Sequence, residues 1–515
     1  MVFMLAPVKN MLNKPNVILP LSPSYNERGI DGFAATVTNS LDQRKINLQY
    51  EPVKNAMTGK TTLYLTPRPG FSRSSTTIGS ADQQAYLIAL QPGQSAVNDA
   101  GHLVFSTKGD DLRASRGGIS PFTTVIATEA SLRPKYVDRT NISGTEYLVL
   151  DAGDADPTRT FYAADTDASA WTEISDSDFT GIVQTGKLEH LDGYAHAFDR
   201  GLGRIYSSNL NSLANWTATS FVTKQIQQDI NVGLARHGNQ ILAFGASTCE
   251  VFRNAGTAVG SPLQVVPQLA ARVGMGELTI AHATNYYAQL GGLMYFIGRL
   301  ATGDRVESVF AYNGATFEKV STNAIDRILA SATEKYSINT VVWAGQQAIA
   351  IGLSLPSSAA QRWLMFFPEW KDWFEWTSDV FQPVNSGKLF IASAATAGDR
   401  VFEIPTTNTW IDHSTDYTRE IVFNMPTDGN QLKRMAWAGV VADSQSAGAS
   451  ASAGVYLQMA FANNADFSFG AARQIDLRGR KKQIYRCGAF RDRAVKITHS
   501  GNVQFRIQNF IAKVL

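Results

Sequence analysis

A short apolar segment that follows a glycine turn recurs four times in the middle of this 515-residue chain. The four segments are residues 194–198, 240–244, 293–297 and 347–351. The turns before them contain Gly193, Gly238, Gly292 and Gly345. The interval between repeats is about 45 to 55 residues, which has room for about four short strands and their turns. Such a unit is typical of one blade of a β-propeller, since each blade is a small twisted antiparallel sheet.

A second element repeats beside the first. Residues 161–171 and 205–216 both run from an apolar strand through a polar hairpin turn to a tryptophan, with one residue inserted before the second tryptophan. Between Thr145 and Ile411 the pattern gives five or six units, and we predict six blades. Two stacked β-sandwiches are the alternative, because their turn signals also recur about every 8 to 12 residues.

The composition favours an all-β chain. Charged residues make up only 17%, below the roughly 25% of an average globular protein, and there are 41 glycines. Residues 1–120 contain short extended pieces between Pro, Gly and Ser clusters, and residues 413–515 contain strands around a Ser, Ala and Gly loop. We therefore predict a β-propeller over residues 121–412, and a β-rich platform formed by residues 1–120 and 413–515.

Global features argue against several function classes. A net charge of +2 gives no field that would steer the chain to nucleic acid or to an anionic membrane. The two cysteines, Cys249 and Cys487, predict buried thiols in a reducing compartment. Lys9, Lys14 and Pro15 interrupt the apolar start of the chain, so no secretory signal is expected, and no apolar run is long enough to insert in a membrane.

Familiar catalytic motifs are missing from the sequence. It contains no Gly-x-Ser-x-Gly elbow, no HExxH and no Walker loop, and Gly201-Leu-Gly203 lacks the third glycine of a dinucleotide-binding loop. We predict a protein that is not an enzyme and holds no cofactor. A pair of carboxylates for glycoside hydrolysis stays open as an alternative, because such a pair converges from distant positions.

Two groups of residues have the chemistry of metal ligands. Acidic residues near the first repeat either supply oxygen ligands to Ca²⁺ or form solvated hairpin turns, and we favour turns because the EF-hand spacing is missing. They are Asp151, Asp154, Asp156, Asp165, Asp167, Asp176 and Asp178. His190 and His196 have the even separation that places side chains on one face of a strand, but Gly193 lies between them in a predicted turn. No metal site is therefore predicted.

The densest aromatic run lies between residues 363 and 376. It contains Trp363, Phe366, Phe367, Trp370, Trp373, Phe374 and Trp376. We predict aromatic packing in a blade core, or anchoring of an interface, for Trp363, Phe367, Trp370, Trp373 and Trp376. The alternative is a surface on which sugar rings stack, as expected of a polysaccharide-binding or polysaccharide-cleaving propeller.

The strongest charged feature is a basic run near the C-terminus. It contains Arg478, Arg480, Lys481, Lys482, Arg486, Arg491 and Arg493. We treat this run as a candidate assembly interface, with a solvated hairpin face as the alternative. Any DNA contact made here would use backbone charge and would not read bases.

Several segments together indicate a family. In the centre these are residues 205–212 (IYSSNLNS), 240–252 (QILAFGASTCEVF), 271–274 (ARVG) and 320–329 (VSTNAIDRIL). Towards the ends they are residues 63–70 (LYLTPRPG), 485–493 (YRCGAFRDR) and 496–500 (KITHS). In this order they resemble the tail hub or nozzle proteins of short-tailed bacteriophages, also called packaged-DNA stabilisation proteins. No segment within residues 72–160 resembles this family.

The resemblance implies a structural virion protein of the phage tail, made in the host cytoplasm. Such proteins form a homohexamer below the portal and its adaptor ring, and continue the channel through which phage DNA passes without sequence-specific contact. They retain the packaged genome and dock tail fibres, spikes or a plug. The family has no catalytic motif, so the resemblance assigns no active-site residues, and the basic run becomes a candidate contact between platform and adaptor.

Overall fold

The computed structural model shows a chain built almost entirely of β-strands. The described residues are 17–20, 44–54, 59–77, 84–90, 102–108, 111–116, 124–128, 136–151, 159–164, 171–226, 229–257, 259–276, 286–300, 307–343, 345–354, 361–378, 381–383, 389–392, 400–403, 410, 412, 416–425, 432–443, 455–463, 468–478 and 482–515. They belong to two compact units. The platform unit is Met1–Ser72, Met365–Ser378 and Pro405–Leu515, and the propeller unit is Arg73–Leu364 and Asp379–Ile404.

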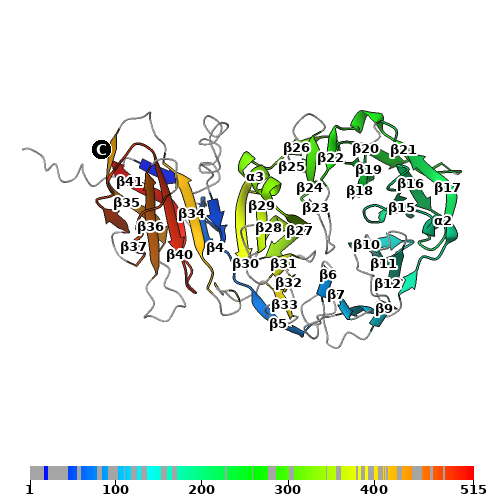
Figure 1. The fold of residues 1–515 in the computed structure, drawn as a ribbon, viewed down its shortest axis with the longest axis horizontal. Helices are drawn as coiled ribbons and strands as arrows, with labels where there is room; N and C mark the ends of the chain where they lie inside the picture. Colours follow the sequence, from blue (N-terminus) through cyan, green and yellow to red (C-terminus); the bar gives the residue numbers. More distant parts are fainter. Residues whose placement is uncertain are drawn as a thin grey trace, which may run out of the picture. The chain divides into compact units, whose positions relative to one another are not determined.

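The propeller unit consists of antiparallel sheets that follow one another along the chain and around a ring (Figure 1). The first sheet contains β6 (Gln84–Leu90), β7 (His102–Lys108), β8 (Asp111–Arg116) and β9 (Thr124–Thr128). The second contains β10 (Tyr136–Ile142), β11 (Thr145–Asp151), β12 (Thr160–Ala164) and β13 (Thr172–Glu173). The third contains β14 (Glu189–Leu191), β15 (Tyr194–Phe198), β16 (Arg204–Ser208) and β17 (Trp216–Thr223). The fourth contains β18 (Asn231–His237), β19 (Gln240–Gly245), β20 (Cys249–Asn254) and β21 (Leu263–Val265).

The later sheets vary this plan. The fifth contains β22 (Val273–Met275), β23 (Tyr287–Leu290), β24 (Leu293–Leu300), β25 (Glu307–Tyr312) and β26 (Phe317–Lys319). Both β22 and β23 pair with the same edge of β24, and β23, which ends at the glycine turn, is counted below as the first strand of this blade. The sixth opens with β27 (Glu334–Trp343) and β28 (Gln346–Ser354); β29 (Gln361–Phe367) begins in the propeller unit, and β30 (Asp372–Ser378) belongs to the platform unit. The seventh contains β31 (Phe381–Pro383), β32 (Leu389–Ala392), β33 (Arg400–Glu403) and β5 (Ser72–Thr77). Short helices α2 (Ser177–Thr180), η4 (Pro267–Leu269) and α3 (Asn323–Ser331) lie between strands.

The all-β fold class and the propeller are therefore confirmed. The described strands make seven sheet groups, against the six blades predicted. The additional group, β6–β9, lies in the segment predicted to be irregular, because long connections such as residues 91–101 hide the repeat. The last group takes β5 from the start of the unit, an arrangement that joins the two ends of the propeller sequence.

The domain boundaries also differ from the prediction. The propeller was expected over residues 121–412, whereas the propeller unit begins at Arg73 and its last segment ends at Ile404. Residues 365–378, which include most of the aromatic run, belong to the platform unit.

The glycine-turn repeat marks the connection between the first and second strands of a blade. The four repeated segments lie in β15, β19, β24 and β28. Before β15, Asp192 has φ 49° and Gly193 has φ 84°, and Leu191 pairs with Tyr194 across the turn. Positive φ at both turn positions is the two-residue hairpin geometry that matches the twist of the flanking strands. The second repeated element is equally consistent, because β12 and β16 are both third strands of their sheets.

Neighbouring blades share hydrophobic cores. Ile142 and Val149 of the second sheet pack in one cluster with Leu188, Ala195 and Trp216 of the third region. A second cluster joins the third sheet to the fourth, and it contains Phe198, Ile205, Ile241 and Phe252. First strands of successive sheets also lie against one another, as β14 does against β18 and β23 against β27. The first strands therefore surround the ring axis.

The platform unit contains strands from both ends of the chain. One sheet has the order β3 (Leu48–Lys54), β4 (Thr61–Pro67), β41 (Arg506–Val514), β35 (Lys433–Asp443) and β38 (Gln483–Tyr485). In addition β1 (Val17–Pro20) pairs with β41, and β39 (Ala489–Phe490) pairs with β35. The other set has the order β30, β2 (Arg44–Ile46), β34 (Arg419–Asn424), β40 (Arg493–His499), β36 (Tyr456–Asn463) and β37 (Arg473–Asp476). Phe423 and Phe510 meet between these two sheets with ring centroids 5.0 Å apart, in the platform core.

Helices contribute little to the structure. Within the described ranges, no helix has the length and apolar character needed to cross a membrane.

Candidate functional site

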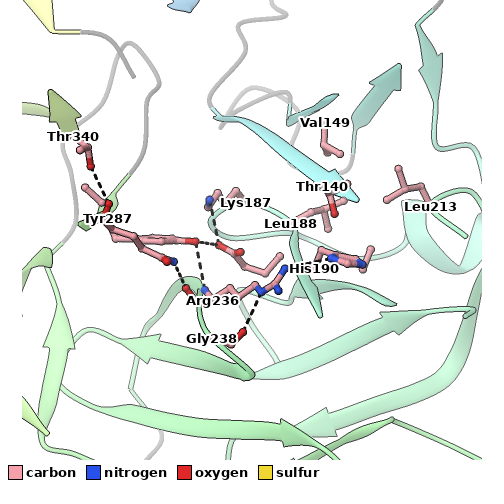
Figure 2. A pocket seen from close by; sticks show the side chains of 14 residues that line it. Thr140, Val149, Lys187, Leu188, His190, Leu213, Arg236, Gly238, Tyr287 and Thr340 are labelled. Atoms are coloured by element: carbon pink, nitrogen blue, oxygen red, sulfur yellow. Dashed lines mark hydrogen bonds and ion pairs between the residues drawn. The ribbon is translucent and has the colours of Figure 1, made fainter. Parts of the chain in front are cut away.

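A pocket of about 510 Å³ lies where the first strands of five blades come together (Figure 2). Its polar lining includes Thr140 on β10, Glu189 and His190 on β14, Arg236 on β18, Tyr287 on β23 and Thr340 on β27. Most of these residues lie close to the turn that ends their strand. The pocket is therefore on the side of the ring where the first strands end, and we call it the axial pocket.

One wall of the axial pocket is a network of buried groups. Lys187 Nζ lies 3.4 Å from Glu189 Oε1, and the hydroxyl of Tyr287 donates to the same oxygen at 2.8 Å. The ammonium group is also 4.5 Å from the centroid of the Tyr287 ring. Because the charges of Lys187 and Glu189 offset each other, this wall contributes no net charge.

Unlike Lys187, Arg236 makes its described contacts with uncharged groups. Its Nε donates to the carbonyl of Gly238 at 3.2 Å, and its Nη1 lies 3.4 Å from His190 Nδ1. None of the carboxylates in the described part of the chain forms an ion pair with Arg236. Burial, together with the charge of Arg236, lowers the pKa of His190 to about 4, so this imidazole is neutral at pH 7.

The wall behind the pocket depends on a close approach between blades. The hydroxyl of Tyr286 donates to the carbonyl of Leu234 and lies 3.4 Å from the amide of Lys187, from which it accepts. A Cβ added at Gly186, which has φ +73°, would lie 2.7 Å from the Cα of Gly233. Only glycine fits this contact, so the spacing of the walls is fixed by backbone packing.

The described members of the acidic group have separate structural roles. Asp151 is buried and accepts from Thr160 Oγ1 at 2.7 Å and from the amide of Leu188 at 3.1 Å. Asp176 caps α2 by accepting from the amide of Asp178 at 2.9 Å. The remaining members, Asp154, Asp156, Asp165 and Asp167, lie outside the described residues. No group of three His, Cys, Asp or Glu side chains is placed to hold a metal ion within the described ranges.

The two histidines are placed on neighbouring strands. His190 is on β14 and His196 on β15, with the turn at Gly193 between them as predicted. His196 is fully buried, its Nδ1 lies 3.0 Å from Ser207 Oγ, and burial lowers its pKa to about 3. Only His190 reaches the axial pocket.

The aromatic run is largely buried. Trp363, Phe367 and Trp376 are no more than 1% exposed, Trp373 is 8% exposed, and Trp370 is partly buried. In the platform unit, Phe366 and Trp373 pack with ring centroids 4.8 Å apart. These rings serve as core packing and leave little face for a sugar to stack on.

The basic run divides into exposed and buried members. Arg486 and Arg491 are exposed, Arg478 lies 3.4 Å from Asp476, and Lys482 donates to the carbonyl of Ala442 at 2.5 Å. Arg480 and Lys481 lie outside the described residues.

Arg493 differs from the expectation of a surface contact. It is 3% exposed and donates from Nε and Nη2 to Asn463 Oδ1 at 3.0 and 2.8 Å. Its Nη1 donates to the carbonyl of Cys487 at 2.6 Å, and its guanidinium lies over the ring of Phe490. Arg493 therefore stabilises the platform core.

Strand register adds one cation that the run alone does not reveal. Arg434 is exposed and pairs with Ala489 of β39, so it joins Arg486 and Arg491 around that strand. We call these three residues the β39 arginines. No salt bridge joins any of them to a described carboxylate. The sequence alone could not have placed Arg434 in this group, because its position depends on the pairing of β35 with β39.

Fold and sites together define a class: a β-propeller protein with a separate β-sheet platform. Residues 152–358 match the family described as "Bacteriophage P22 Gp10, beta-propeller". The match confirms the family predicted from the sequence and supports a structural role in a phage virion. Over residues 152–358 the chain is thus similar to the phage packaged-DNA stabilisation family.

Other comparisons give remote similarity. No curated protein sequence matches the chain significantly. A puromycin-hydrolysing peptidase of Mycobacterium tuberculosis aligns with a TM-score of 0.37 and 10% identity, over 69% of this chain and 60% of the peptidase. The chain therefore spans less than two thirds of that protein. BamB of Moraxella catarrhalis aligns with a TM-score of 0.33 and 11% identity, over 65% of this chain and 99% of BamB. The Nup133 β-propeller domain of Vanderwaltozyma polyspora aligns with a TM-score of 0.35 and 8% identity, over 68% and 99%.

Proposed function

We propose that this protein is a tail nozzle subunit of a short-tailed phage. In this proposal six copies form a ring below the portal and adaptor, continue the DNA channel, retain the packaged genome and dock tail appendages. The subunit catalyses no reaction and holds no cofactor. The single observation that carries the proposal is the match of residues 152–358 to the phage family.

Features of the platform unit support an assembly role. Its strands come from both ends of the chain and from residues 365–378, and they form a compact unit of their own. The β39 arginines are exposed and have no described acidic partner, which suits them to an acidic surface on another protein. In this proposal they contact the adaptor ring.

Native mass spectrometry and electron microscopy of the full chain, alone and with its adaptor, test the proposal. We expect a ring of six subunits when the adaptor is present. A chain that stays monomeric with the adaptor would contradict the nozzle assignment, whatever its fold.

The interface is tested with a triple variant, Arg434→Ala, Arg486→Ala and Arg491→Ala. Rim charges mainly change association rate and its salt dependence, so docking should slow and lose much of its sensitivity to salt. The control, Lys54→Ala with Lys60→Ala, removes charge beside β3 and β4, at the opposite end of the sheet from β38. Equal docking by the triple variant and the control would refute the contact.

A further inference from the structure

The axial pocket contains two hydrogen-bond donors that face each other. The amide of Gly193 donates to His190 Nε2 at 3.2 Å, so in the neutral imidazole the single proton is on Nδ1. That N–H lies 3.4 Å from Nη1 of Arg236, which is also a donor. Neither group can accept from the other. An oxygen placed beside both would accept from both.

The charge around these donors favours an anion. Lys187 and Glu189 offset each other, and Arg236 forms no ion pair with a carboxylate in the described ranges. The described lining therefore has a surplus of one positive charge at neutral pH. The planar fork of an arginine suits a carboxylate, which carries one negative charge. Asp192, the acid whose charge acts on His190, is outside the lining and accepts from Asn254 at 3.1 Å.

The rest of the lining offers hydrogen bonds to hydroxyl groups. Thr140 is 9% exposed, lines the pocket, and its Oγ1 has no hydrogen-bond partner. Such a buried unpaired hydroxyl costs free energy unless a ligand or water reaches it. Gln289 and Thr340 also line the pocket, and Thr340 Oγ1 donates to the carbonyl of Gln289 at 3.1 Å. Leu188 and Leu213 supply apolar surface for a ring face.

We propose that the axial pocket binds an acidic saccharide, with Arg236 and His190 holding its carboxylate and Thr140 bonding a sugar hydroxyl. The volume of about 510 Å³ lies within the roughly 300–1,000 Å³ usual for small-ligand sites. Uronic acids and related sugars combine a carboxylate with several hydroxyls. This binding activity does not depend on the position in the tail proposed above, so either proposal can fail alone.

Titration of the full chain with glucuronate, followed by calorimetry and ligand-observed NMR, tests the pocket. We expect saturable binding at millimolar concentrations, weaker binding of neutral glucose by at least tenfold, and weaker binding of acetate. Equal affinity for glucose and glucuronate would overturn the role of the carboxylate. Equal affinity for acetate and glucuronate would overturn the saccharide, and so would preferential binding of an acidic peptide.

Variants locate the site. Arg236→Gln should weaken glucuronate binding by roughly tenfold to a hundredfold, because it removes charge-assisted hydrogen bonds. Thr140→Val should weaken it by roughly two- to tenfold and keep the preference for the carboxylate. The control Arg253→Gln removes an exposed arginine outside the lining and should bind as the parent does. If Arg236→Gln does not fold, Arg236→Lys, which keeps the charge but loses the fork, replaces it. Unchanged binding by a folded Arg236 variant would refute the proposal.

Discussion

The buried ion pair between Arg68 and Asp412 tests how the platform unit is held together. Arg68 is fully buried; its Nη1 donates to Asp412 Oδ1 at 2.9 Å and its Nη2 to the other carboxylate oxygen. The same Oδ1 accepts from the amide of Phe71 at 3.1 Å. Burial alone would lower the pKa of Arg68, but the attraction of Asp412 outweighs it and the pKa is raised. The guanidinium therefore stays charged inside the protein.

The substitution Asp412→Ala removes the acid and leaves the cation in place. Arg68 would keep hydrogen bonds to Asn47 Oδ1 at 3.0 Å and to the carbonyls of Pro69 and Thr377, but no carboxylate. Breaking a buried pair in this way costs about 3–5 kcal/mol, a large part of the roughly 5–15 kcal/mol that stabilises a typical domain. We expect the platform unit to open at much lower urea concentration than in the parent.

Because the chain has two units, a single global transition is a poor readout. Hydrogen exchange measured on peptides of β34 and β40 reports the opening of the platform alone. Asp476→Ala is the matched control, since its pair with Arg478 is 3.4 Å long and both side chains are exposed, so it should cost about 0–1 kcal/mol. Adding Arg68→Met to Asp412→Ala should restore much of the lost stability, because no charge is then left buried. A cost below about 1 kcal/mol for Asp412→Ala, or no recovery in the double variant, would refute the reasoning.

Three further outcomes are expected. Arg493→Ala should destabilise the platform by about 2–4 kcal/mol in urea unfolding, because it leaves carbonyl and amide acceptors unpaired. The control Arg491→Ala, at an exposed arginine, should change the free energy of unfolding by less than about 1 kcal/mol. Equal effects of the two substitutions would contradict the buried role of Arg493. The pKa of His196 in the folded state, about 3, lies below its unfolded value, so the stability that the neutral imidazole contributes is complete above about pH 6.5 and is lost as pH falls towards 3. Between pH 6 and 4 the free energy of unfolding of the parent should fall by about 1.4 kcal/mol per pH unit more than that of His196→Gln. Parallel plots of unfolding free energy against pH for the two proteins would contradict this. Gly186→Ala should give the propeller unit a much lower melting temperature than Gly238→Ala does. Both glycines have positive φ, but only the Cβ added at Gly186 would meet backbone atoms. Similar melting temperatures would show that the walls of the axial pocket can move apart.

Much of the propeller could be predicted from sequence because one local device recurs in it. A two-residue turn with positive φ needs glycine or a residue such as Asp192, and this requirement leaves a visible mark before each second strand. The sheet β6–β9 was missed because the connection between β6 and β7, residues 91–101, is far longer than the two-residue turn between β14 and β15. The pairing of β5 with the last sheet could not be predicted either, because pairing between strands distant in sequence leaves no periodic pattern.

Residue type alone could not distinguish the exposed arginines of the platform from the buried ones. Arg491 and Arg493 belong to one basic run, yet the first is exposed and the second is enclosed by Asn463 and Phe490. The difference arises where β39 ends and β40 begins: Arg491 lies in the bend between the two strands, whereas Arg493 is the first residue of β40. Arg434, in turn, joins the exposed group only through its register with Ala489.

The axial pocket shows how the repeat could be used to find a site that has no motif. Its polar residues are spread from Thr140 to Thr340, so no spacing between them is conspicuous. Each glycine turn, however, fixes where a first strand ends, and first strands lie around the axis. Polar residues just before these turns, such as Arg236 two residues before Gly238, are therefore brought to one end of the ring. The same turns that make the blades recognisable therefore also determine which side chains meet in the pocket.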